Sequence, residues 1–181
     1  MLRGELTGLR ALTDADIEVF ETELHTDGET RVRATGQPWV PLTPGAADSP
    51  YRKAEAAVVR FAVVELATGD LAGEAVMSGI DLHNRHAEIG LVLRPGSRGR
   101  HLGTDVVRVL CHYGFSVRGL HRIQITTLAD NHAMIAAAVR SGFVLESTAR
   151  EVAWLDVGFA DGVTLSQLSG EWSPAGVPAG R

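Results

Sequence analysis

Residues 86–104 read HAEIGLVLRPGSRGRHLGT and carry successive structural signals. The run 86–93 is rich in apolar residues and predicts a strand. Pro95 has no N–H for a sheet ladder, so this strand must end near it. The glycine-containing run Arg98–Thr104 then leads into a helix that is apolar on one side. A strand, a glycine turn and a helix N-terminus form an anion site, because the first helical N–H groups lack internal partners.

The segments around this stretch alternate between strand and helix patterns. Strands are expected over 2–12, 58–66, 71–80, 121–128 and 143–145, with two more around a turn at 158–162. Helices are expected over 14–25, within 51–60, from 102 to Gly119, and from a cap at Asp130 or Asn131 to Ser141–Gly142. This order predicts one α/β (α+β) domain over residues 1–172, a mixed central β-sheet flanked by helices. The small-residue tail 173–181 is expected to be flexible.

The segment 26–50 has no clear periodicity and holds four of the seven prolines. A loop of this length is either a binding loop or a solvated insertion, and both readings stay open. Trp39 favours binding, because a large aromatic side chain in a loop needs an apolar neighbour or a ligand. We therefore name Trp39 as a substrate contact. The aromatic residues Phe143, Trp154 and Trp172 are expected in the core.

Composition excludes several classes of protein. The 181-residue chain has a formal net charge of −5 and a pI of about 5.8, which argues against non-specific nucleic-acid binding. No apolar run approaches the roughly 20 residues that span a bilayer, and the charged start MLRGELTGLR is unlike a signal peptide. The single cysteine, Cys111, excludes an internal disulfide. We expect a cytoplasmic protein that binds neither membrane nor nucleic acid; a homodimer is one of the states we consider.

The glycine loop fits neither of two common phosphate fingerprints. No Gly-Lys-Ser/Thr ends it, and the third glycine and following acidic residue of the dinucleotide pattern are missing. The combination of 87–93, 98–104, Asp130–Asn131 and 140–143 instead strongly resembles the GNAT superfamily of acyl-CoA-dependent N-acetyltransferases. The flanks 8–16 and Glu171–Trp172 are similar to the branch that includes the ribosomal-protein N-terminal acetyltransferases. The resemblance covers residues 7–172.

This resemblance implies acetyl-CoA as co-substrate, no metal, and transfer of an acetyl group to a primary amine on a protein N-terminus or a small molecule. Main-chain N–H groups of 99–104 would hold the pyrophosphate, the backbone of 91–93 would bond the pantetheine arm, and Asn131 would lie near the cofactor. The implied cofactor-binding residues are Leu91, Val92, Leu93, Arg98, Gly99, Arg100, His101, Leu102, Gly103, Thr104 and Asn131.

Two departures from the family pattern matter. His101 stands where the family has glycine, and a positive φ there would cost of order 1 kcal/mol. Met134 and Ala138 stand where many members carry a Ser or Tyr that protonates the leaving thiolate. A thiolate with a thiol pKa near 8.5 can leave without full protonation. An acyl-CoA-binding protein with weak or lost catalysis is therefore the alternative function.

Direct transfer needs an uncharged amine, so a general base is expected near the thioester. Glu88 lies on the strand beside the expected cofactor and is the first candidate. His86 is the second, because the imidazole pKa near 6.5 suits proton transfer. His83 and His86 have no obvious third ligand, so we expect no zinc site.

Overall fold

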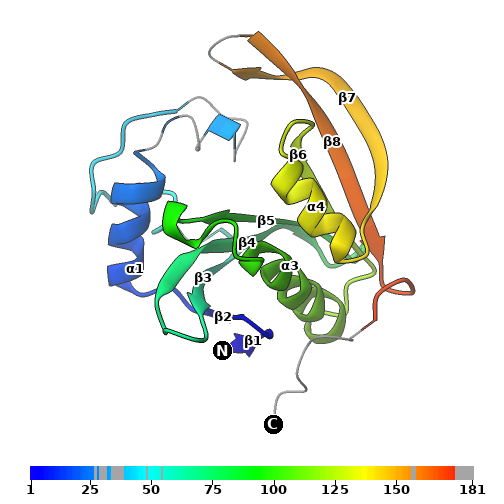
Figure 1. Cartoon of the computed structure of the whole chain (residues 1–181), viewed down its shortest axis with the longest axis horizontal. Coiled ribbons are helices and arrows are strands. Elements are labelled where there is room, and N and C mark those ends of the chain that lie inside the picture. Colours follow the sequence, from blue (N-terminus) through cyan, green and yellow to red (C-terminus); the bar gives the residue numbers. More distant parts are fainter. Residues whose placement is uncertain are drawn as a thin grey trace.

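The computed structural model describes residues 1–26, 28, 32–33, 39–47, 49–53, 55–155 and 158–173. These residues form one eight-stranded sheet in the order β1-β2-β3-β4-β5-β6-β8-β7, with helices on its faces (Figure 1). Only the β5–β6 pair among these neighbours is parallel. The strands are β1 (Leu2–Arg3), β2 (Thr7–Arg10), β3 (Val59–Glu65), β4 (Leu71–Asp81), β5 (His86–Leu93), β6 (Arg122–Leu128), β7 (Val144–Leu155) and β8 (Gly158–Leu168). The prediction of a mixed, helix-flanked sheet is confirmed.

Among the described residues, three longer helical segments pack on the sheet. Helix α1 (Asp14–Val19) continues as a π-helical turn over Phe20–Leu24, and α3 (Leu102–His112) continues likewise over Tyr113–Val117. Helix α4 spans His132–Arg140. All three lie where the sequence predicts helices. No helix in the described ranges is long and apolar enough to cross a membrane.

The two faces of the sheet are packed by different helices. The main core lies on the α3 side and includes the fully buried Val106 and Leu110 of α3 and Ile123 of β6. A smaller cluster of Phe20, Leu24 and Tyr51 lies on the other side. Strand β5 contributes side chains to both clusters, because side chains alternate between the two faces of a strand. Leu91 and Leu93 pack on the α3 side, and Val92 packs on the α1 side.

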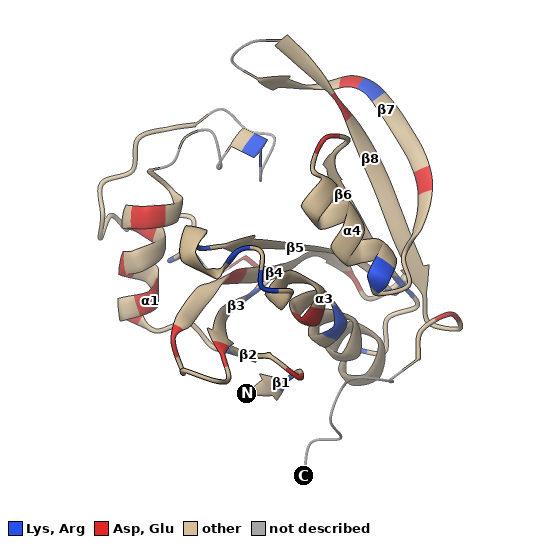
Figure 2. Ribbon diagram, in the orientation of Figure 1, with Lys and Arg blue, Asp and Glu red and all other residues tan. Residues whose placement is uncertain are grey.

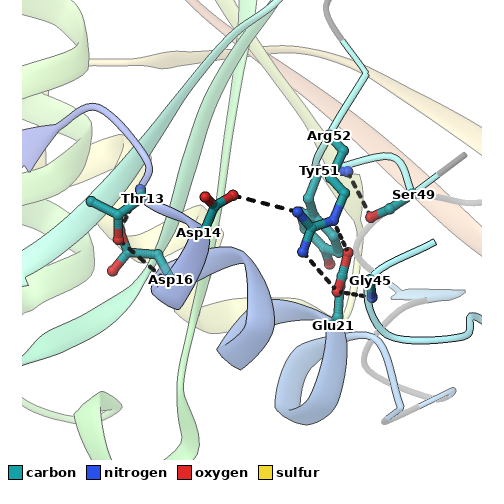
Figure 3. A network of polar contacts seen from close by, with 8 residues as sticks. All are labelled: Thr13, Asp14, Asp16, Glu21, Gly45, Ser49, Tyr51 and Arg52. Carbon is teal, nitrogen blue, oxygen red and sulfur yellow. Dashed lines mark hydrogen bonds and ion pairs between the residues drawn. The ribbon is translucent and has the colours of Figure 1, made fainter. Parts of the chain in front are cut away.

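The buried carboxylate of Glu21 ties the α1 segment to residues 45–52 (Figure 3). Gly45 N–H donates to Glu21 Oε2 at 2.7 Å, and Arg52 Nε donates to Oε1 at 3.1 Å. Burial opposes ionisation of Glu21, but hydrogen bonds from Ser49, Gly45 and Arg52 outweigh it and hold the pKa of this carboxyl below its usual value. Part of the long segment 26–50 is thereby fixed against the domain.

Four expectations about the fold are wrong, and three of them concern residues 49–58, the last hairpin and Trp154. Residues 49–53 and 55–58 form turns rather than a helix, with Tyr51 buried against Phe20. The last hairpin turns between Leu155 and Gly158, and β8 runs through Gly162, where Val152 lies over a position with no space for a side chain. Trp154 is 61% exposed rather than buried, although Phe143 and Trp172 do pack in or against the core.

The expected strand 2–12 is broken into β1 and β2 by a buried carboxylate. Asp105 of α3 accepts hydrogen bonds from the N–H groups of Glu5, Leu6 and Thr7 and from Thr7 Oγ1, at 2.7–3.0 Å. These contacts satisfy backbone donors that a continuous strand would have paired with a neighbour. They also fix the N-terminal edge of the sheet to the first turn of α3.

We predict that Asp105→Ala lowers the free energy of unfolding by about 3 kcal/mol, because buried N–H groups lose their acceptor. Denaturant unfolding followed by circular dichroism measures this loss. Glu18→Ala, on the exposed side of α1, is the control and should change stability by less than about 0.5 kcal/mol. Equal stabilities of the two variants would contradict the assignment.

Candidate active site

Strands β5 and β6 begin as a parallel pair and then part. Their pairing joins His86–Glu88 to Arg122–Gln124 and does not extend to residues 89–93 of β5. Strand β5 remains paired with β4 along this stretch, and β6 with β8. The sheet therefore opens between its two parallel strands, toward their C-terminal ends.

The alternation of the β4–β5 ladder decides which backbone groups face this opening. Arg94 N–H donates to Ala72 O at 2.9 Å, so Arg94, and Val92 two residues earlier, direct their backbone groups toward β4. Leu91 and Leu93 therefore direct theirs toward the opening. The carbonyl of Leu93 accepts from Arg98 Nε at 3.0 Å, which is consistent with this direction. A polar, extended ligand could pair with the backbone of Leu91 as an added strand would.

A cavity of about 600 Å³ occupies the opening and extends to the N-terminus of α3 and the inner side of α4. Nearly all cofactor-binding residues implied by the resemblance line it: Leu91, Val92, Leu93, Arg98, Gly99, His101, Leu102, Gly103, Thr104 and Asn131. Arg100 does not, because its guanidinium pairs with Glu65 instead. These residues therefore come together around one cavity, and their role in binding a cofactor stays a prediction.

The first turn of α3 presents an unneutralised helix N-terminus to this cavity. His101 precedes the helix with φ 60° and ψ 5°, the left-handed conformation expected to cost about 1 kcal/mol for a residue with a β-carbon. No side chain caps the helix, and Asp105 in its first turn is bound to residues 5–7. The N–H groups of Leu102 and Gly103 are therefore available to an anion.

The opposite wall comes from the start of α4. Asn131 caps this helix, since its Oδ1 accepts from Met134 N–H at 3.2 Å and its Nδ2 donates to Thr127 Oγ1 at 2.9 Å. Arg33, from the long loop, donates to Asp130 Oδ1 at 2.6 Å and lowers the pKa of that carboxyl. The loop that the sequence left open between binding and insertion thus reaches the cavity through Arg33.

The two candidate bases lie at different places. Glu88 directly precedes Ile89, which lines the cavity where the strands part, and Glu88 Oε2 accepts from Gln124 Nε2 at 3.3 Å. His86 lies at the start of β5, with its Nε2 3.8 Å from Asp81 Oδ2. Five residues of strand, about 16 Å, separate His86 from Leu91. Neither side chain lines the cavity, but Glu88 is the nearer of the two along β5 to the residues that do.

Of the remaining predicted positions, one lines the cavity and two do not. Met134 lines the cavity, whereas Ala138 is fully buried in the core. Trp39 does not line the cavity; its Nε1 donates to His25 O at 2.7 Å, and its ring lies over Gly28. No group of three potential metal ligands occurs among the described residues.

Sequence reasoning did not name Arg33, Thr126, Thr127 or Arg140 as site residues, although all four line the cavity. Thr126 and Thr127 lie within the predicted strand 121–128, and the parting of the strands leaves them at the cavity. Arg140 belongs to the stretch 140–143 that carries the family resemblance, but the resemblance assigns it no role in binding. The packing of α4 against α3 brings it to the cavity.

The sheet and its helices have the fold of the N-acetyltransferases. The sequence model of the acetyltransferase (GNAT) domain matches residues 7–144, and the chain belongs to this family. A putative ribosomal N-acetyltransferase, YdaF of Bacillus subtilis, is 32% identical over 104 residues, which are 58% of this chain and 57% of that protein. The chain thus aligns with little more than half the length of this relative.

Solved structures agree on the fold. A GCN5-related N-acetyltransferase from Brucella melitensis superposes with a TM-score of 0.74 at 25% identity, over 94% of this chain and 79% of that one. The spermidine N-acetyltransferase of Vibrio cholerae, solved with CoA and spermine, gives 0.79 at 20% identity, over 92% and 97%.

We predict that Gly103→Val weakens acetyl-CoA binding at least about 10-fold while leaving the fold intact. A β-carbon at Gly103 would meet only Leu93 Cδ1 at 3.9 Å and Leu91 Cδ1 at 4.0 Å, so the fold has space for it. The added methyl groups would instead enter the cavity beside the helix N-terminus. Calorimetric titration measures the affinity. The matched control is Gly96→Val, outside the cavity lining and with open space around it; equal affinities for both variants would refute the assignment.

Proposed function

We propose that this protein transfers an acetyl group from acetyl-CoA to a primary amine by direct attack. The observation that carries the proposal is the cavity between the parting strands, bounded by the free N-terminus of α3. One end of this cavity suits a phosphate group, and the other suits an extended arm that bonds strand backbone. A phosphorylated pantetheine arm combines both features. The family of the chain supports the same reading.

The proposed reaction balances with the groups in and beside the cavity. The amine nitrogen bonds to the thioester carbonyl carbon, the carbon–sulfur bond breaks, and one amine proton must leave. Glu88 is the proposed acceptor of that proton, directly or through a water molecule. The departing thiolate takes a proton from solvent in this scheme, because Met134 cannot donate one.

An acyl-CoA-binding protein with weak catalysis is the second candidate. Met134 in the cavity wall and the buried Ala138 favour it, since neither position can supply a proton to the thiolate. Both candidate functions predict binding of acetyl-CoA, but only the acetyltransferase predicts efficient turnover.

Two acceptors are proposed, a protein N-terminus and a small-molecule amine. The first is consistent with the ribosomal N-acetyltransferase of Bacillus subtilis, and the second with the Vibrio cholerae enzyme that was solved with spermine. Trp154 and Phe159 pack edge to face with ring centres 5.0 Å apart, and both are more than 60% exposed. Such a patch supports a homodimer. A cytoplasmic location stays a prediction from the sequence.

The proposal is tested by calorimetric titration with acetyl-CoA and by thiol release against a panel of peptides, polyamines and amino acids. Binding together with amine-dependent thiol release is the expected result. Binding without release from any amine would favour the acyl-CoA-binding protein. No binding at millimolar acetyl-CoA would exclude both.

We predict that Glu88→Gln keeps acetyl-CoA affinity and lowers turnover by ~10² to 10⁴ near pH 7. Glutamine is nearly isosteric with glutamate but cannot take up the proton. The loss should shrink toward pH 9, because more of the amine is already neutral there. Steady-state rates across pH 6 to 9 measure this, with Glu18→Gln as control. A wild-type rate throughout would remove Glu88 from the mechanism.

A further inference from the structure

Arg140 is a basic residue in the cavity that neither the glycine loop nor the acyl chemistry uses. It is the last residue of α4 and the only basic one of that helix. Figure 2 shows basic residues at this end of α4 and along the segment that leads into α3. Arg140 is exposed, and no acidic side chain of the described residues lies within 4.0 Å of its guanidinium.

The packing of α4 on α3 places this arginine beside the proposed phosphate site. Ser141, the next residue, donates its hydroxyl to Thr104 O in the first turn of α3 at 3.4 Å. Arg108 of α3 donates to the carbonyl of Arg140 at the same distance. Arg140 also lines a second, smaller cavity together with Arg108 and Trp172. It therefore lies where the two cavities adjoin, next to the contact between α4 and the first turn of α3.

The other arginines of the main cavity have different surroundings. Arg33 is paired with Asp130. Arg98 precedes the helix N-terminus and binds Leu93 O through Nε. CoA carries a pyrophosphate and, on its ribose, a separate phosphate monoester. The few free N–H groups of one helix N-terminus can hold the first but leave the second without a partner.

We propose that Arg140 binds the ribose phosphate of CoA and is the residue that makes the protein prefer CoA to ligands lacking that phosphate. This inference rests on the proposed function. If pantetheine follows β5 from Leu93 toward Ile89, the nucleotide end must leave the cavity on the opposite side of the α3 N-terminus. Arg140 lies beside the first turn of α3 and has no acidic partner within 4.0 Å among the described residues. Its guanidinium can bind a phosphate through two N–H groups at once.

The test compares the affinities of CoA and dephospho-CoA, measured by calorimetry for the wild type and three variants. The wild type should bind CoA about 10-fold more tightly than dephospho-CoA. Arg140→Gln should bring the two affinities within about 2-fold by weakening CoA alone. Arg150→Gln, which removes an exposed charge of β7 outside the cavity, should keep the wild-type ratio. Arg98→Gln should weaken both ligands and also keep the ratio.

Equal binding of the two ligands by the wild type would overturn the inference, as would an unchanged ratio in Arg140→Gln. The inference would also be overturned if Arg98→Gln, rather than Arg140→Gln, abolished the preference for CoA over dephospho-CoA. These results leave the proposed function standing, because CoA still binds. A wild-type protein that binds neither ligand would overturn the proposed function and this inference with it.

Discussion

Strands β5 and β6 share parallel pairing over three residues each, and the candidate site depends on their separation beyond that point. Backbone groups of Leu91 and Leu93 would otherwise be used within the sheet. Because the strands part, these groups face a cavity while both strands stay anchored by antiparallel neighbours. An opening in a sheet exposes polar backbone that a ligand can satisfy. The backbone groups that the sheet leaves unpaired are therefore the same groups that could bind an extended polar arm.

Helices α3 and α4 form the remaining walls of the cavity. The first turn of α3 points its free N–H groups at the cavity, and Asp105, which could have neutralised them, is instead bound to the turn between β1 and β2. The same carboxylate therefore fixes the edge of the sheet and leaves the helix N-terminus positive. Helix α4 supplies the opposite wall through Asn131 at one end and Arg140 at the other.

The sequence predicted the fold where local signals are strong. The cap at Asp130 or Asn131, which the structure assigns to Asn131, the strand ending before Pro95 and the glycine loop are all short-range features, and the structure has them. The sequence-based prediction was wrong where contacts between distant parts of the chain determine the structure. The break at residues 4–6 depends on Asp105, about 100 positions away, and the outward position of Trp154 depends on a hairpin longer than its pattern suggested. Arg33 reaches the cavity only through the packing of its loop, and no local pattern marks it. Arg140 lies in a recognisable motif, but its place in the cavity depends on the packing of α4 against α3.

In the proposed function, acetyl-CoA lies between β5 and β6 and bonds the exposed backbone of β5. Amide hydrogen exchange followed by NMR, with and without acetyl-CoA, tests this placement at single residues. We expect the ligand to slow exchange at Leu91 and Leu93 and in the first turn of α3, while amides at the outer end of the β7–β8 hairpin exchange as before. Binding of acetyl-CoA without slower exchange at Leu91 and Gly103 would contradict it.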